Sequence, residues 1–405
     1  MNTTDDLTRT LRDQADRVGG HPIDFESVRG RARGIQRRRR VAAGAGVLAA
    51  IAVIAPIAVA ANGGLLGSDN PLPPATQVPS PTPVGVVKAD ASSAPRGDAP
   101  TIPWLERTVL HQPDGTTTDL GKPYQQVTPY DGGWAVTDII ENTTSFLDAD
   151  GNVRRTFPGS SLVVAADGEA FATVLEATGG LDVGLYPAAG VGPGGYLSSV
   201  VSFDGTVDLA GFTRREGPAQ GAPGAQEVAY NLRSANGRSS GVWLTDWEQE
   251  PRRLQGLLNV RATSQVNGLV SGLTSIDELE PGSCSAVVVA ATGQHRWETC
   301  DYTLESFSPD GRYVIGTDAY ADGIGGRTVA ILDATDGTVI VDYTTADFGF
   351  TGSSVWESSS TVLTTTYQDG RWYALRLGLD GTMTQVLDPV RAPDVNNPWG
   401  WGLRP

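Results

Sequence analysis

Several reactive side chains are scarce in this 405-residue sequence. It contains three histidines, two cysteines and two methionines, and its only lysines are Lys88 and Lys122. So few histidines and cysteines leave no cluster with the ligand spacing of a metal site. There is also no phosphate-binding loop and no H-E-x-x-H sequence. The sequence therefore nominates no catalytic, cofactor-binding or metal-binding residue, and only its 46 Asp and Glu residues keep carboxylate chemistry open.

Positive charge is scarce outside the first 40 residues. Residues 1–40 carry ten arginines and six acidic residues, whereas the whole chain has a formal net charge of −16. A nucleic-acid-binding domain would show the opposite sign over its largest part. We therefore expect no nucleic-acid partner.

One long apolar run, residues 41–61, divides the chain. It reads VAAGAGVLAAIAVIAPIAVAA and has no charged side chain; as a helix it would be about 30 Å long, the thickness of a hydrocarbon core. Seven arginines lie between residues 29 and 40, and residues 62–70 contain no Lys or Arg. The positive-inside rule then predicts a single transmembrane helix with residues 1–40 in the cytoplasm and the remainder outside. The alternative is a signal peptide cleaved near Ala58-Val59-Ala60.

The sequence of the leader, residues 1–40, predicts two short helices. Apolar residues recur at helical spacing from Leu7 to Val18, and Gly19-Gly20 ends that first helix. The second helix ends in Arg37–Arg40, which would lie at anionic lipid headgroups. A second interpretation gives the leader a cytoplasmic protein partner, as in membrane-bound anti-sigma factors.

Residues 62–103 have the composition of a linker. They contain nine of the chain's 26 prolines, and Ser, Thr, Ala and Gly fill most of the other positions. Such a segment, without apolar periodicity, forms a semi-rigid polyproline-like spacer. We therefore predict that a folded domain occupies residues 104–405.

The pattern of residues 104–405 is that of short strands joined by tight turns. Pairs such as Asp150-Gly151 and Asp310-Gly311 separate short apolar runs, and glycine supplies the positive φ that hairpin turns require. Gly293, Gly337 and Gly381 are spaced 44 residues apart, the length of a four-stranded propeller blade. The sequence predicts an all-β propeller of about seven blades, with six and eight as alternatives. Pairing of the tail near residues 389–401 with the first blade would close the ring.

The same repeat assigns turns to individual glycines. Residues 212–240 are the least regular stretch and are predicted to form a long surface loop. Outer hairpin turns are predicted at Gly115, Gly151, Gly190, Gly237, Gly293, Gly337 and Gly381, and inner hairpin turns at Gly132, Gly168, Gly205, Gly268, Gly311 and Gly352.

One stretch carries a resemblance to a known family. Residues 307–314, FSPDGRYV, resemble the F-S-P-D-G-[KR]-x-[VL] hairpin of WD40-like and TolB-like β-propellers, and partial echoes occur near Gly168 and Gly205. With the Arg-, Ala- and Gly-rich composition, this resemblance implies a propeller on a single-pass bacterial membrane protein of actinobacterial type. It implies architecture and not activity, because propellers host many functions.

The two cysteines, Cys284 and Cys300, are symmetric about residue 292, the middle of a predicted turn within residues 287–297. Antiparallel strands joined there set the two residues opposite each other, with Cα atoms about 4.5–5.5 Å apart and within disulfide reach. An exported domain would allow the bond to form. We therefore predict a Cys284–Cys300 disulfide, with two reduced, packed thiols as the alternative.

All nine tryptophans lie beyond residue 103. They would either pack between blades or form a stacking platform for a sugar or peptide at the channel mouth, and the sequence does not separate the two. His111, beside a turn, and His295, on a strand, are expected at the surface.

These features favour a membrane-anchored, extracytoplasmic propeller that acts as a binding or interaction module in the cell envelope. Its expected partners are the membrane and an envelope protein, peptide or glycan. Two alternatives stay open. One is an envelope glycan hydrolase or lyase with carboxylates in the channel, and the other is a transmembrane, anti-sigma-like sensor that acts through the leader.

Overall fold

Every regular element of the described residues is a β-strand. The computed structural model describes residues 81–402 apart from short gaps at 139, 160, 167, 169, 178–179, 188–196, 202–204, 215–225, 235–238, 247–249, 278–281, 321–324, 347–348 and 393–396. They belong to the unit Val78–Pro405. The predicted leader, residues 1–40, and the predicted transmembrane helix, residues 41–61, lie outside the described part. Within that part, no helix is long and apolar enough to cross a membrane.

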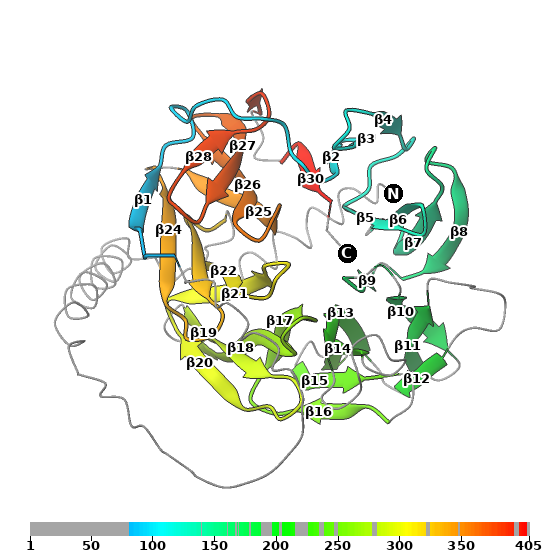
Figure 1. Cartoon of the computed structure of the whole chain (residues 1–405). Helices are drawn as coiled ribbons and strands as arrows, with labels where there is room; N and C mark the ends of the chain where they lie inside the picture. The colour runs from blue at the N-terminus through cyan, green and yellow to red at the C-terminus, as the bar shows by residue number, and fades with distance from the viewer. Residues whose placement is uncertain are drawn as a thin grey trace, which may run out of the picture. The chain divides into compact units, whose positions relative to one another are not determined.

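The strands form seven sheets, each with four antiparallel strands at its centre, which confirms the all-β, seven-bladed propeller. Figure 1 shows the sheets arranged in a ring, and we name the strands of each blade A to D from the centre outward. Blade 2 is β5(Gln126–Tyr130), β6(Gly133–Asp138), β7(Thr143–Leu147) and β8(Val153–Pro158); blade 3 is β9(Leu162–Val164), β10(Ala170–Ala177), β11(Gly180–Pro187) and β12(Leu197–Val201); blade 4 is β13(Gly205–Arg214), β14(Gln226–Ser234), β15(Ser239–Thr245) and β16(Arg252–Leu254).

The remaining blades follow in chain order, except that blade 1 combines both ends of the domain. Blade 5 is β17(Asn259–Ser264), β18(Leu269–Asp277), β19(Gly282–Val289) and β20(His295–Thr299); blade 6 is β21(Tyr302–Phe307), β22(Tyr313–Asp318), β23(Thr328–Asp333) and β24(Val339–Thr345); blade 7 is β25(Phe350–Trp356), β26(Thr361–Gln368), β27(Arg371–Gly378) and β28(Met383–Gln385), with β29(Val390–Arg391) beside β27; blade 1 is β30(Trp399–Trp401), β2(Trp104–Glu106), β3(Val109–His111) and β4(Thr117–Asp119).

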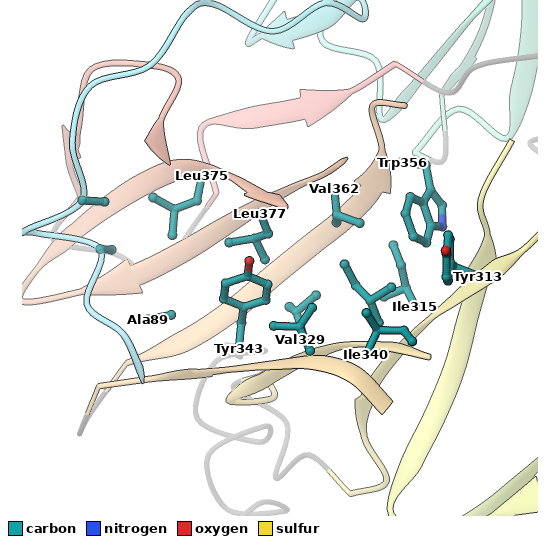
Figure 2. Close-up of a cluster of buried hydrophobic side chains, with 14 of the residues drawn as sticks. Ala89, Tyr313, Ile315, Val329, Ile340, Tyr343, Trp356, Val362, Leu375 and Leu377 are labelled. Atoms are coloured by element: carbon teal, nitrogen blue, oxygen red, sulfur yellow. The ribbon is translucent and has the colours of Figure 1, made fainter. Parts of the chain in front are cut away.

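The core consists of seven apolar clusters, one between each pair of neighbouring blades. Alternation along each strand divides its side chains between two clusters: in β6, Trp134 and Val136 face blade 1, whereas Ala135 faces blade 3. Both faces of a blade are covered by its neighbours, so all six residues of β6 are buried, including Thr137 and Asp138. Figure 2 shows the cluster between blades 6 and 7, where Leu377 of β27 lies close to Tyr343 of β24.

The ring closes as predicted, by pairing of the C-terminal tail with the first blade. β30 lies antiparallel to β2, with Trp104 opposite Trp401 and Leu105 opposite Gly400. The last strand of the chain is therefore the innermost strand of blade 1, and the other three strands of that blade come from the start of the domain. The edge of β2 is thereby paired.

The predicted boundary between linker and fold at residues 103 and 104 is wrong in the part that the structure describes. β1(Gly85–Ala89) pairs in parallel with β24 as a fifth strand of blade 6, and the residues after it continue over blade 7 to β2. We call residues 85–103 the strap. Its Ala91, Ala94 and Ile102 are buried in the clusters on either side of blade 7, so proline content alone misjudged this stretch.

Several assigned turns are also corrected. Gly205 begins β13 and so lies between blades, and Gly352 lies inside strand β25. The outer turns predicted at Gly190 and Gly237 lie outside the described residues. The expected long loop at 212–240 is interrupted by β14(Gln226–Ser234). Outer turns at Gly115, Gly151, Gly293, Gly337 and Gly381 join strands C and D as predicted, and inner turns at Gly132, Gly168, Gly268 and Gly311 join strands A and B.

The F-S-P-D-G stretch forms the A–B turn of blade 6. The Ser308 hydroxyl donates to Asp310 at 2.6 Å and accepts from the Tyr313 N–H at 3.0 Å. Gly311 has φ +70°, the left-handed conformation that glycine adopts without steric cost. The two polar side chains and the glycine therefore fix the hairpin locally, before any contact between blades is made.

Candidate functional site

The channel at the centre of the ring contains a cavity of about 240 Å³ lined by strands or turns from six of the seven blades. The lining comes from strand A of each of these blades and from the A–B turns that follow in blades 3, 5 and 6. Those turns define one face of the propeller, and the B–C turns and blade-to-blade connections define the opposite face. The cavity therefore extends toward the A–B face.

The described residues that line this cavity are all uncharged. Its polar groups are amides and hydroxyls, and its apolar walls include three aromatic rings. The lining residues on which the chemistry depends are Gln126, Thr128, Phe212, Thr263, Ser264, Gln265, Ser306, Phe307, Ser308 and Trp356. An uncharged lining favours a neutral ligand with hydrogen-bonding groups, because a charged ligand would lose its hydration without gaining an ion pair.

Some of these polar groups already have partners that hold them in place. The Gln265 side chain accepts a hydrogen bond from the Ala166 N–H at 2.7 Å, which joins the A–B turns of blades 5 and 3 across the blade between them. The Trp356 Nε1 donates to the Ser306 carbonyl at 3.1 Å and so orients the ring at the cavity wall. These contacts rigidify the lining.

Two hydroxyls in the lining are buried without a partner. Thr128 is 2% exposed, and neither its Oγ1 nor the Oγ of Ser306 has a hydrogen-bond partner among the residues that the structure describes. A buried hydroxyl without a partner costs about 1–3 kcal/mol. Both oxygens have almost no exposed surface, so a ligand group would recover that cost if the side chain rotates to present its hydroxyl to the cavity.

The described lining residues include no side chain that could act as a general acid or base, because none of them is Asp, Glu, His, Lys, Cys or Tyr. Glycoside cleavage by the usual route needs two carboxyl groups about 5–10 Å apart across the bond. The carboxylates expected in the channel by the hydrolase alternative are therefore missing from this cavity.

The predicted disulfide is present. Cys284 and Cys300 are bonded, with their Cα atoms 4.0 Å apart. The ladder between β19 and β20 pairs Ser285 with Thr299, so the cysteines are the next pair outward in the same register. The bond joins strands C and D of blade 5, away from the channel lining.

Most of the described tryptophans pack between blades, which confirms the first of the two alternatives for them. Trp134, Trp372, Trp399 and Trp401 are buried in these clusters. Trp356 also packs between blades 6 and 7 and additionally lines the cavity. The channel mouth thus has one tryptophan at its wall and not a platform of several.

His111 is half-buried, so its expected surface position is wrong. Its ring stacks on Trp104 with centroids 3.7 Å apart and 4° between planes. Burial lowers the pKa of His111, and the nearby Glu106 carboxylate opposes that effect. The pair lies on β2 and β3 in blade 1 and outside the cavity; His295 is exposed, as expected.

The tract of residues 237–241, GRSSG, matches the G-x-S-x-G pattern of a hydrolase nucleophile. Its serine, Ser239, pairs with Arg233 across the antiparallel β14–β15 hairpin. A nucleophile elbow needs a strand-to-helix turn. The described part of the tract, residues 239–241, therefore lies in strand β15 and gives no support for a hydrolase.

The cavity residues were missed from sequence because Thr, Ser and Gln recur throughout the domain. In blades 4 to 7, strand A also contains a β-bulge, at Ala210, Arg261, Glu305 and residues 352–353 respectively. A bulge changes which side chains face the channel. Gln265 and Ser308 lie beside inner turns that were predicted correctly, at Gly268 and Gly311, but nothing in the sequence marked them as lining a channel.

No protein-family model matches the chain, and no curated protein matches it either. Among solved structures, the chain is similar to TolB from Acinetobacter baumannii, at 13% identity over 78% of this chain and 68% of that chain, with a TM-score of 0.41. It is similar to the Dos1 propeller at 11% identity over 74% and 87%, with a TM-score of 0.45. It is also similar to a prolyl endopeptidase structure at 11% identity over 72% and 47%, with a TM-score of 0.51. At these identities the likeness concerns the fold and carries no ligand or activity to this chain.

Proposed function

We propose that the protein is a binding module whose channel cavity takes an uncharged ligand rich in hydroxyl or amide groups. The observation that carries this proposal is the pair of unpartnered hydroxyls, on Thr128 and Ser306, in a lining without ionisable side chains. Neutral glycans and peptide backbones offer the complementary groups. The hydrolase or lyase alternative ranks lower because this lining supplies no carboxylate.

The test uses paired variants of the full-length chain. Thr128→Val and Ser306→Ala each remove an unpartnered hydroxyl from the cavity and should weaken ligand binding about tenfold, equivalent to roughly 1.4 kcal/mol. Thr245→Val and Ser285→Ala remove equally buried, unpartnered hydroxyls that do not line the cavity and should leave binding unchanged.

The probes are uncharged oligosaccharides and end-blocked peptides, measured by ligand-observed NMR and calorimetry. Because replacing an unpartnered buried hydroxyl does not disrupt a hydrogen bond, all four variants should fold. If neither probe class binds, or if all four variants bind equally well, the channel cavity is not the ligand site.

The proposed location is the outer side of the cell membrane, held by residues 41–61. The sequence of that run and its flanking arginines support this proposal, as does the Cys284–Cys300 disulfide, since such bonds persist in oxidising compartments. Protease added to intact cells should cleave the propeller domain. Protection in intact cells, with cleavage only after lysis, would refute the location. The anti-sigma-like alternative depends on the leader, outside the described residues, and nothing in the propeller favours it.

A further inference from the structure

A second and larger cavity, of about 560 Å³, lies on the face opposite the A–B turns. It is bordered by the B–C turn of blade 1 at Arg107 and by the connection between blades 1 and 2 at Pro123 to Gln125. Its other borders are β29, at Arg391, and Asn397 and Pro398 just before β30. The cavity therefore lies where the ring closes, and its ligand would be distinct from that of the channel cavity.

Positive charge is concentrated at this cavity in an otherwise acidic protein. Arg107 and Arg391 both line it, and neither guanidinium has an ion-pair or hydrogen-bond partner in the described part of the chain. No described lining residue is acidic. Arg371, also exposed, is the direct cross-strand partner of Arg391 and adds a third unpaired charge nearby.

Two acidic residues lie near the cavity, but both bind a lysine. Lys122 lies 5.2 Å from the ring centroid of Tyr124, a lining residue. Its Nζ is bound by Asp138, at 2.8 Å, and by Glu141. These hydrogen bonds raise the pKa of Lys122. The lysine is thus neutralised by two carboxylates, whereas the arginines of the cavity are left without any.

Two features of this cavity cost stability. Arg107 has φ +57°, a left-handed conformation that residues with a β-carbon other than Asn and Asp rarely adopt. Arg371 and Arg391 place like charges directly opposite each other on an antiparallel pair, which is destabilising. When residues that lower the stability of the fold meet at one cavity, they indicate a site that is kept for binding.

We infer that this closure cavity binds a sugar that carries a single carboxylate, with Arg107 and Arg391 as the groups that hold the carboxylate. Arginine pairs with carboxylates through two parallel hydrogen bonds. The lining also contains apolar side chains, from Tyr124, Pro398 and Trp399. An amino acid fits less well because its ammonium group would meet no acidic side chain among the described lining residues. The net charge of −16 would repel a polyanion.

The test is direct binding of glucuronate to the full-length chain by ligand-observed NMR, with glucose as the uncharged analogue. Glucuronate should bind, glucose should bind at least tenfold more weakly, and about 0.5 M salt should weaken glucuronate binding by screening. The double variant Arg107→Asn, Arg391→Gln should lose at least tenfold in affinity. It should fold at least as well as the wild type, because Asn accepts the left-handed conformation and the like-charge pair is removed.

Arg296→Gln is the matched control, since Arg296 is exposed on β20 and no partner of its side chain is described. It should bind glucuronate as the wild type does. Equal binding of glucuronate and glucose would overturn the inference, as would unchanged affinity in the double variant. Preferential binding of an N-acetylated tripeptide through its free terminal carboxylate would replace the sugar by a chain terminus and would also overturn it. Thr128→Val and Ser306→Ala should not alter glucuronate binding, so failure here and failure at the channel cavity are distinguishable.

Discussion

At the scale of single residues, one tryptophan explains why a turn glycine cannot be replaced. The Trp297 ring of blade 5 lies over Gly337 in the C–D turn of blade 6, and its Nε1 donates to the Ala334 carbonyl at 2.9 Å. A β-carbon on Gly337 would lie 2.7 Å from Trp297 Cε3. The glycine is thus required twice, by its φ of +78° and by the ring above it.

Gly337→Ala should therefore destabilise the protein more than Gly370→Ala. Gly370 has a similar φ, +75°, but nothing lies within 4 Å of the position of its β-carbon. Both variants incur the left-handed cost of about 1–2 kcal/mol, and only the first adds overpacking of about 1–3 kcal/mol. Urea unfolding of both variants measures the difference. Equal free energies of unfolding would show that the ring simply moves aside.

The stacked pair of Trp104 and His111 predicts a pH dependence of stability. Burial lowers the pKa of His111 in the folded chain below its ordinary value of 6.5, so the folded state resists protonation more than the unfolded state. Its stabilising contribution is complete above about pH 6.5 and is lost as the pH falls toward the folded pKa.

Thermal unfolding followed by circular dichroism between about pH 5 and 7.5 tests this sign, across the range in which histidine titrates. The melting temperature should fall on acidification, and His111→Phe, which keeps a ring on Trp104, should reduce that fall. The same substitution at the exposed His295 should leave the slope unchanged. A slope that survives His111→Phe would assign the effect to other groups.

At the scale of elements, the strap is held by one buried ion pair. Glu357 is 2% exposed; its carboxylate accepts from Arg376 Nη2 at 2.6 Å and from the Thr101 N–H at 2.7 Å. Arg376 also donates to the carbonyls of Asp98 and Ala99 at 3.1 and 3.0 Å. The pair thus binds the backbone of the strap and fixes it on blade 7.

Glu357→Gln should destabilise the protein by about 3–5 kcal/mol, because it leaves the Arg376 charge without its partner. Burial raises the pKa of Glu357, but the hydrogen bonds from Arg376 and Thr101 outweigh it and hold that pKa below its ordinary value. The contribution is therefore present at neutral pH and lost on acidification. Chemical denaturation measures it, with the exposed Glu298→Gln as control. A loss no larger than that of the control would mean that the other contacts of the strap, including its pairing with β24, are enough to hold it.

The disulfide is an element-scale constraint on blade 5. It spans 16 positions in the sequence, and a loop of this length is worth about 3 kcal/mol in the unfolded chain. Cys284→Ser with Cys300→Ser should lower the free energy of unfolding by up to that amount and remove the effect of reductant. Thiol labelling of the unfolded wild type without reductant should find no free thiol; two reactive thiols would contradict the bond.

Turns could be predicted from the sequence only where a glycine is present for its backbone conformation. Where a hairpin needs a positive φ, as at Gly293 and Gly381, sequence placed the turn correctly. Gly352 has a different cause, since a β-carbon there would lie 2.4 Å from Thr365 Oγ1. Composition alone cannot separate a turn from a close approach. Proline content misled in the same way at the strap, where small buried side chains decide the packing.

At the scale of the whole molecule, repeat spacing predicted about seven blades, and the way in which propellers close their rings predicted the pairing of the tail with the first blade. The binding cavities could not be predicted, because each collects side chains from blades that are distant in sequence. Gln126 and Trp356 line one cavity, and Arg107 and Arg391 line the other. No local pattern marks such a set, and the bulges in strand A further change which residues face inward.

Because β30 closes the ring, the effect of removing it from the chain can be predicted. A chain ending at Pro398 lacks β30, which exposes the edge of β2 and removes Trp399 and Trp401 from the core between blades 7 and 1. We expect loss of cooperative unfolding, dye binding to exposed apolar surface, and self-association measured by size-exclusion chromatography. A synthetic peptide of residues 398–405 added in trans should restore part of the stability. A monomeric, cooperatively unfolding truncated chain would show that the strap alone holds the ring.

The position of β30 also sets an order of events during synthesis. The strands of blade 1 that it completes leave the ribosome before the other six blades, and β30 follows those blades. Until β30 has been synthesised, the nascent chain carries an unfinished blade whose open edge can pair with neighbouring chains.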